Sequence, residues 1–256
     1  MHTCNETLRR LERLHVRAWP AAETERIDGW LWRWSGGGSQ RANSVSTIDF
    51  IGNDMVAALD RVEARYRGKS SPIQLQTFEL TRPAGLAAML TERGYGAGET
   101  TLTMLATAPP GMIPPSVAPS GAPALHVTVT GDPVAEWLDV YLEAITESRR
   151  VVNQRILRRI PDPRAFFAVR RGTQVISTAL GVADGGHAVA ECVATRADQR
   201  GLGGAGLAMR ALMAWAASLG AHTVGLQVVA DNQPAIALYR RLGFEAVGAN
   251  RFWVRR

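Results

Sequence analysis

A glycine-rich stretch in the second half of the chain carries the residue types best suited to binding phosphate. It reads QRGLGGAG and spans residues 199–206. Glycines let a backbone approach a ligand closely, and the free N–H groups in the first turn of a helix attract anions. Arg200 adds a positive charge beside these groups. The stretch therefore predicts a phosphate-binding loop that opens a helix.

Two classes of ligand match this pattern. Gly201, Gly203 and Gly206 follow G-x-G-x-x-G, the fingerprint of dinucleotide-binding enzymes of the NAD type. Arg200, Gly203 and Ala205 follow R-x-x-G-x-A, a loop that holds the pyrophosphate of coenzyme A. Both interpretations place phosphate at a helix N-terminus, so the rest of the chain has to decide between them.

The dinucleotide interpretation fits poorly with the position of the loop. A dinucleotide-binding fold has its fingerprint in the first strand–helix turn, and several strand–helix units follow. Only residues 207–256 follow here, and their pattern predicts one strand, one helix and one strand. Asp231 could still imitate the acidic residue that binds ribose, so an NAD-type enzyme stays open as an alternative. In the coenzyme A interpretation, Gly206 is expected to let the helix pack closely on the sheet.

A second motif lies downstream and carries a resemblance. The segment VADNQPAIALYRRLGFEAVG spans residues 229–248 and follows N-x-x-A-x-x-L-Y-x-x-x-G-F. Together with the glycine loop, in this order and spacing, it resembles the GNAT superfamily of acyl-CoA-dependent N-acyltransferases over residues 125–256. More loosely, the stretch WLWRWSGGGSQRANSV in the first half resembles the degenerate partner half of tandem GNAT proteins.

The resemblance implies a fold and a reaction. The fold is of the α/β class, with a mixed, mostly antiparallel sheet covered by helices and two similar halves. The activity is that of an N-acetyltransferase, which uses acetyl-CoA as cosubstrate and passes acetyl directly to an amine in a ternary complex. The acceptor would be a small molecule or a peptide, and a homodimer is compatible with the sequence. A non-catalytic acyl-CoA-binding or sensor protein is the alternative, if the acceptor cleft lacks a working base.

The resemblance also assigns the residues that bind the cosubstrate. Asn232 contacts it or caps the next helix, and Tyr239 points its phenol at the sulfur as a general acid or packs in the core. The end of the strand before the loop pairs with the pantetheine arm, and the N–H of Val193 faces the developing oxyanion. The full set comprises Val193, Ala194, Thr195, Arg200, Gly201, Leu202, Gly203, Gly204, Ala205, Asn232 and Tyr239.

Glu191 is the candidate general base. Alternation along a strand places it on the same face as Val193 and Thr195, within reach of an acceptor amine. A glutamate within an apolar strand is costly to bury unpaired, so an ion pair with an arginine such as Arg170 is the alternative. His187 is the next candidate base.

Composition excludes several other classes. The histidines and the two cysteines show no metal-ligand spacing, so no metal is expected, and Cys192 is expected in the core on the face opposite Glu191. The net charge of +6 comes from arginines spread along the chain, and residues 149–159 resemble an exposed helix face. This favours an anionic small molecule and no nucleic acid. The absence of a long apolar run predicts no membrane span and a cytoplasmic location.

The chain divides into two halves. Residues 106–124 are rich in Pro, Ala, Gly and Ser and predict a linker between a first half, 1–105, and an acetyl-CoA-binding half, 125–256. Residues 73–98 and 224–248 share the order strand, Pro-Ala helix start, Gly-aromatic pair and strand, which indicates an internal repeat. Trp30, Trp32 and Trp34 alternate on one strand, where they pack in the core or form a wall of the acceptor pocket.

Overall fold

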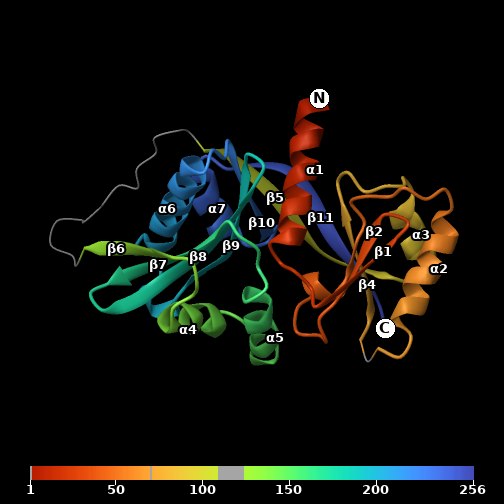
Figure 1. Cartoon of the computed structure of the whole chain (residues 1–256), viewed down its shortest axis with the longest axis horizontal. Helices are drawn as coiled ribbons and strands as arrows, with labels where there is room; N and C mark the ends of the chain where they lie inside the picture. Colours follow the sequence, from red (N-terminus) through yellow and green to blue (C-terminus); the bar gives the residue numbers. More distant parts are fainter. Residues whose placement is uncertain (1, 70, 109–123) are drawn as a thin grey trace.

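The computed structural model describes residues 2–69, 71–108 and 124–256, and its strands form one continuous eleven-stranded sheet (Figure 1). The strand order is β1-β2-β3-β4-β11-β5-β10-β9-β8-β7-β6. The pairs are antiparallel except β3 with β4 and β9 with β10. The predicted mixed, mostly antiparallel α/β sheet is confirmed.

Each half supplies a similar set of elements. The first half contains α1 (His2–Arg17), β1 (Glu23–Ile27), β2 (Trp30–Trp34), the 3-10 turn η1 (Arg41–Asn43), β3 (Val45–Ser46), α2 (Met55–Tyr66), β4 (Ile73–Phe78), α3 (Leu86–Glu92) and β5 (Gly96–Thr107). The second contains β6 (Leu125–Thr130), α4 (Ala135–Glu143), α5 (Glu147–Leu157), β7 (Arg164–Arg171), β8 (Gln174–Asp184), β9 (His187–Thr195), the 3-10 turn η2 (Ala197–Gln199), α6 (Gly204–Ser218), β10 (Thr223–Val229), α7 (Gln233–Arg241) and β11 (Glu245–Arg255).

The two halves exchange their last strands. The repeat noted in the sequence corresponds to β4-α3-β5 in the first half and β10-α7-β11 in the second. β5 pairs with β10 of the other half, while β11 pairs with β4 of the first half and with β5. The halves predicted from the sequence therefore share one sheet. The predicted linker lies outside the described residues over 109–123, and β5 extends to Thr107.

Two helical layers cover the sheet of the second half. α6 and α7 pack on one face through a core that includes Leu212 and Ile236. α1, α4 and α5 cover the other face through Leu11, Trp137 and Ile156. Figure 1 shows α1, in red, standing between the two halves. Residues on the α1 face therefore meet side chains from both halves.

The tryptophans of β2 are core residues. Trp30 and Trp32 are fully buried against α2 and α3, and Trp34 lies at the edge of the same cluster. The alternative role as a wall of the acceptor pocket is therefore wrong for Trp30 and Trp32, and for the half-buried Trp34 it stays a prediction. Because side chains alternate along a strand, the opposite face of β2 presents Leu31 and Arg33 toward the second half.

Candidate active site

The parallel strands β9 and β10 separate in the middle of the sheet. Their pairing runs from His187 and Thr223 to Ala190 and Leu226 and stops there. Glu191 and Gln227 are the first residues beyond the paired stretch. The sheet therefore opens next to these two side chains.

A β-bulge at Cys192 accompanies this separation. Cys192 has a φ of 53°, and the register between β8 and β9 shifts at this position. A bulge adds one residue and interrupts the alternation of side chains. Glu191 consequently contacts α1, whereas Val193 packs with the cluster under α6 and Cys192 packs with the cluster under α1 and α4. The expectation that Glu191 and Val193 share a face is wrong, as is the placement of Cys192 opposite Glu191.

A groove of about 560 Å³ lies at the opening, on the face of the sheet that α6 and α7 cover and that lies opposite α1. It is bounded by the end of β9, the start of α6 and α7. Its lining includes all but one of the residues predicted to bind the cosubstrate. These are Val193, Ala194, Thr195, Arg200, Gly201, Gly203, Gly204, Ala205, Asn232 and Tyr239. Leu202 is 43% exposed and lies outside the lining. The structure thus brings together residues that are more than 40 positions apart in the sequence, from Val193 to Tyr239.

The glycine loop presents unpaired backbone donors to the groove. Gly201 and Gly203 have φ values of 79° and 84°, in the region that favours glycine, and no atom lies within 4 Å of the position a Cβ would take there. The N–H groups of Gly204, Ala205 and Gly206 have no hydrogen-bond partner in the described part of the chain, and no side chain caps α6. Three free N–H groups at a positive helix end therefore suit a diphosphate.

Close packing of α6 on the sheet depends on Gly204. A Cβ on Gly204 would overlap Ser177 Oγ and lie 3.1 Å from Ser177 Cβ on β8. A Cβ on Gly206 would make an ordinary contact, 3.5 Å from Leu238 Cδ1. The sequence interpretation assigned this packing role to Gly206, and the structure moves it to Gly204.

Asn232 and Tyr239 enter the groove from α7. Asn232 caps this helix, because its Oδ1 accepts a hydrogen bond from the N–H of Ala235 at 3.3 Å. The predicted cap is confirmed, and contact with the cosubstrate stays a prediction. The Tyr239 hydroxyl forms no hydrogen bond within the described residues. Burial, with the nearby charge of Glu191, raises the pKa of Tyr239 to about 12, so its proton is retained at neutral pH.

Glu191 is held in a buried ion pair. Arg41 Nη1 and Nη2 donate to its two carboxylate oxygens at 2.8 Å each, and His15 Nδ1 lies 3.0 Å from Oε1. Burial alone would raise the pKa of Glu191, but the Arg41 charge and the hydrogen bonds from His15 and Arg41 lower it to about 2. The expected partner, Arg170, binds Glu136 instead. A carboxylate with a pKa of about 2 is a weak base, so the ion pair argues against Glu191 as the general base. That role stays a prediction.

The first half supplies residues that the sequence analysis missed. Glu12 of α1 is 3% exposed and accepts hydrogen bonds from Thr103 Oγ1 and, at 2.8 Å, from Gln227 Nε2. Burial raises the pKa of Glu12 above its usual range. Gln227 marks the point where β10 leaves β9, so Glu12 lies at the opening. In the sequence, the feature that could have indicated this role is the presence of Glu12 and His15 on the apolar stripe of an amphipathic helix.

Other candidate groups lie elsewhere. His187 sits at the start of the paired stretch of β9, where its Nδ1 lies 2.7 Å from Thr223 Oγ1, and burial lowers its pKa. It does not reach the opening. Among the described residues, no three His, Cys, Asp or Glu side chains gather as a metal site, and no described helix is long and apolar enough to cross a membrane.

Comparisons with known proteins agree with this geometry. The family described as probable histone acetyltransferase Rv0428c C-terminal matches residues 5–253. A Bacillus subtilis (strain 168) protein described as uncharacterized N-acetyltransferase YobR is 27% identical over 260 residues, which covers 98% of this chain and 100% of the relative.

Solved structures share the fold. A GCN5-related N-acetyltransferase from Kribbella flavida superposes with a TM-score of 0.71 at 17% identity, over 96% of this chain and 94% of the other. A tandem GNAT protein from the clavulanic acid biosynthesis pathway gives a TM-score of 0.61 at 14% identity, over 78% of this chain and 68% of the other. This fold is not the doubly wound sheet that the NAD-type alternative requires. The family match spans nearly the whole chain, and the chain belongs to this acetyltransferase family, as an N-acetyltransferase with the GNAT fold.

Proposed function

We propose that the protein transfers acetyl from acetyl-CoA directly to an amine while both substrates are bound. The observation that carries this proposal is the groove that joins the end of β9, the free N–H groups at the start of α6 and the Tyr239 hydroxyl. The N-terminus of α6 and Arg200 would hold the diphosphate. The pantetheine arm would then run along residues 193–195 toward the opening between β9 and β10.

The acceptor would reach the thioester from the α1 side of the opening. The amine nitrogen attacks the thioester carbonyl carbon, the C–S bond breaks with its electron pair on sulfur, and the amine loses a proton. The N–H of Val193, next to the bulge, would donate a hydrogen bond to the carbonyl oxygen. Direct transfer needs no covalent acyl-enzyme, and burial raises the pKa of Cys192 so that its thiol stays protonated.

Tyr239 would assist the leaving sulfur mainly as a hydrogen-bond donor. A thiol has a pKa near 8.5, and the pKa of Tyr239 is about 12. Complete proton transfer from this tyrosine to the thiolate is therefore uphill by about 5 kcal/mol, at 1.36 kcal/mol for each pKa unit. A hydrogen bond that strengthens as negative charge develops on sulfur stabilises the transition state without this cost.

The proton of the amine requires a base, and Glu12 suits that role better than Glu191. An alkylammonium has a pKa of about 10.4, so a carboxylate with a raised pKa is a better acceptor than one with a pKa of about 2. Glu12 also lies at the opening, beside Gln227. Glu191 would then act as a positioning residue that fixes His15 and Arg41 on the same face.

The proposal is tested by following CoA release with a thiol reagent while acetyl-CoA is mixed with a panel of small amines and peptides. Initial rates measured at varied concentrations of both substrates should give intersecting double-reciprocal lines. Parallel lines would indicate a covalent acyl-enzyme and contradict direct transfer. Binding of acetyl-CoA without turnover of any amine would contradict the assignment of the acceptor as an amine.

A further inference from the structure

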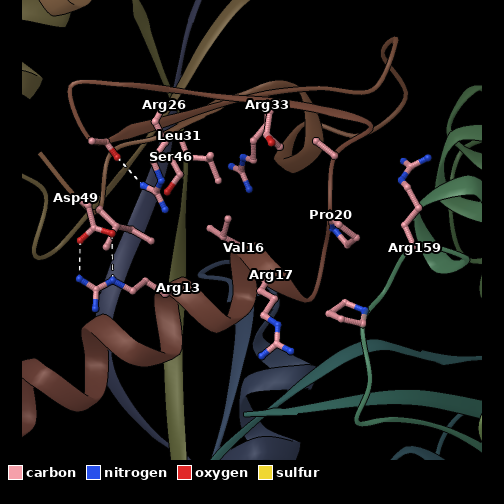
Figure 2. Close-up of a pocket in the computed structure, with 15 residues that line it drawn as sticks. Arg13, Val16, Arg17, Pro20, Arg26, Leu31, Arg33, Ser46, Asp49 and Arg159 are labelled. Carbon is pink, nitrogen blue, oxygen red and sulfur yellow. Dashed lines mark hydrogen bonds and ion pairs between the residues drawn. The ribbon is translucent and has the colours of Figure 1, made fainter. Parts of the chain in front are cut away.

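A second cleft lies on the α1 side of the sheet, away from the groove. It measures about 680 Å³ and shares no lining residue with the groove. Figure 2 shows that α1, the first-half strands β1 to β3 and the segment after α5 surround it. Five arginines line this cleft: Arg13, Arg17, Arg26, Arg33 and Arg159.

Two of these arginines are already neutralised. Arg13 donates to both carboxylate oxygens of Asp49, at 2.7 and 3.1 Å, and Arg9 lies 3.7 Å from the same group. Arg17 pairs with Asp184. Asp49 is the only acidic side chain in the described lining, and both of its carboxylate oxygens accept hydrogen bonds from Arg13.

Arg33 is buried without an anionic partner. Its side chain is 1% exposed, and it donates to the carbonyl and hydroxyl of Ser44 and to Gln76 Oε1, all of them neutral groups. Burial, with repulsion from Arg41, lowers its pKa to about 9, so it remains charged at neutral pH. A buried charge without a counter-ion is costly. In Figure 2 its guanidinium points into the cleft.

Two further cations border the cleft at its rim. Arg26 donates to the carbonyl of Gly29 and forms no ion pair with any described residue. Arg159 forms neither a side-chain hydrogen bond nor an ion pair with the described residues, and burial together with repulsion from Arg155 lowers its pKa. Arg26, Arg33 and Arg159 thus line one cleft, and none of the three forms an ion pair with a described carboxylate. Asp49, the one acidic side chain of the described lining, is bound by Arg13, and the charge of Arg26 also acts on it.

Apart from Thr24 and Ser46, the uncharged side chains of the lining are apolar. Val16, Leu31, Ile48 and Pro161 are among the residues that form the walls between the arginines. We propose that this cleft binds a small molecule with a carboxylate or phosphate head on an apolar body. Arginine recognises both heads through paired N–H donors, and the apolar walls would bury the remainder of the ligand.

The cleft lies next to the proposed reaction centre, on the α1 side of the sheet. Val16 and Arg33 line it, and they also border the small polar pocket that contains Glu12, His15 and Gln227. The ligand is therefore either the acidic end of the acceptor or a separate effector. The binding site itself does not depend on the proposed transfer reaction.

Binding can be measured by calorimetry on the full chain, with saturating CoA to occupy the groove. Octanoate and octyl phosphate serve as anionic probes, and octylammonium has the same apolar body with the opposite charge. We expect saturable binding of one octanoate or octyl phosphate per chain and at least tenfold weaker binding of octylammonium. Arg26→Gln and Arg159→Gln should each weaken anion binding about tenfold, whereas Arg67→Gln, an exposed arginine outside the cleft, should not change it.

The proposal is overturned if neither anion binds saturably, if octylammonium binds as tightly, or if both cleft variants bind like the unmodified protein. Arg26 and Arg159 are exposed, so their variants should fold, which circular dichroism checks. A transfer assay then separates the two sources of ligand. Octanoate that competes with the acceptor amine places the acceptor in the cleft, and octanoate that inhibits or activates without competition identifies an effector site. Both results retain the anion site.

Discussion

The ion pair between Arg41 and Glu191 can be tested by removing each partner in turn. Arg41→Gln leaves the Glu191 carboxylate buried, 7% exposed, with His15 as its remaining partner. Removing one partner of a buried pair costs about 3–5 kcal/mol because the other charge is left uncompensated. The Arg41 side chain is 25% exposed, so we expect a loss of about 3 kcal/mol, at the lower end of this range.

Glu191→Gln should instead change how stability depends on pH. The pKa of Glu191 is about 2 in the folded chain, against an ordinary value of 4.5. Because the folded pKa is lowered, this carboxylate stabilises the fold above pH 4.5 and loses its effect as the pH falls toward 2. The full contribution is about 3 kcal/mol, of which about 1 kcal/mol is lost between pH 7 and pH 3.5.

These free energies of unfolding can be measured by urea denaturation at pH 7 and pH 3.5. The proteins compared are the original chain, both single variants and the double variant. We expect Arg41→Gln to be the least stable at pH 7 and the double variant to regain part of the loss, because it buries no charge. The gap between the original chain and Glu191→Gln should shrink by about 1 kcal/mol at pH 3.5. An unchanged gap, or a Glu191→Gln protein of normal stability whose rate no longer rises with pH, would refute this reasoning and return Glu191 to the role of base.

Three further predictions concern the groove and the opening. Tyr239→Phe removes one hydrogen-bond donor to the sulfur and should lower kcat about 10²- to 10³-fold with little change in acetyl-CoA affinity, and steady-state kinetics that show normal kcat would remove Tyr239 from the mechanism. Gly204→Ala should destabilise the fold by about 1–3 kcal/mol because its methyl meets Ser177, while Gly206→Ala should be neutral or stabilising by up to about 1 kcal/mol in thermal unfolding. Glu12→Gln should lower kcat about 100-fold and flatten the rise of rate with pH, and a normal pH profile would place the base elsewhere.

Those parts of the groove that depend on residues close together in the chain could be predicted from the sequence. The glycine loop, the N-terminus of α6 and the Asn232 cap depend on residues within a few positions of one another, and short-range rules describe them. The strand expected before the glycine loop is observed as β9, His187–Thr195. Most of the lining of the groove could therefore be predicted from the sequence alone.

The side chains around Glu191 could not be predicted in the same way. Arg41 and His15 are separated from it by 150 and 176 positions, and no local pattern pairs them. The bulge at Cys192 is equally hidden, because a bulge adds a residue without a required glycine or proline. One inserted residue reverses the faces of all that follow, so strict alternation placed Glu191 beside Val193.

The exchange of strands explains why the first half contributes to the opening although its sequence lacks a phosphate loop. β5 lies beside β10 throughout Thr101–Thr107, so Thr103 stands opposite Gln227 and both donate to Glu12. A GNAT half without this exchanged neighbour would present Gln227 to solvent or to its own last strand. The buried carboxylate at the opening therefore exists only because α1 and β5 of one half pack against β10 of the other. The first half, which has no phosphate loop of its own, thus positions side chains at the opening of the second half.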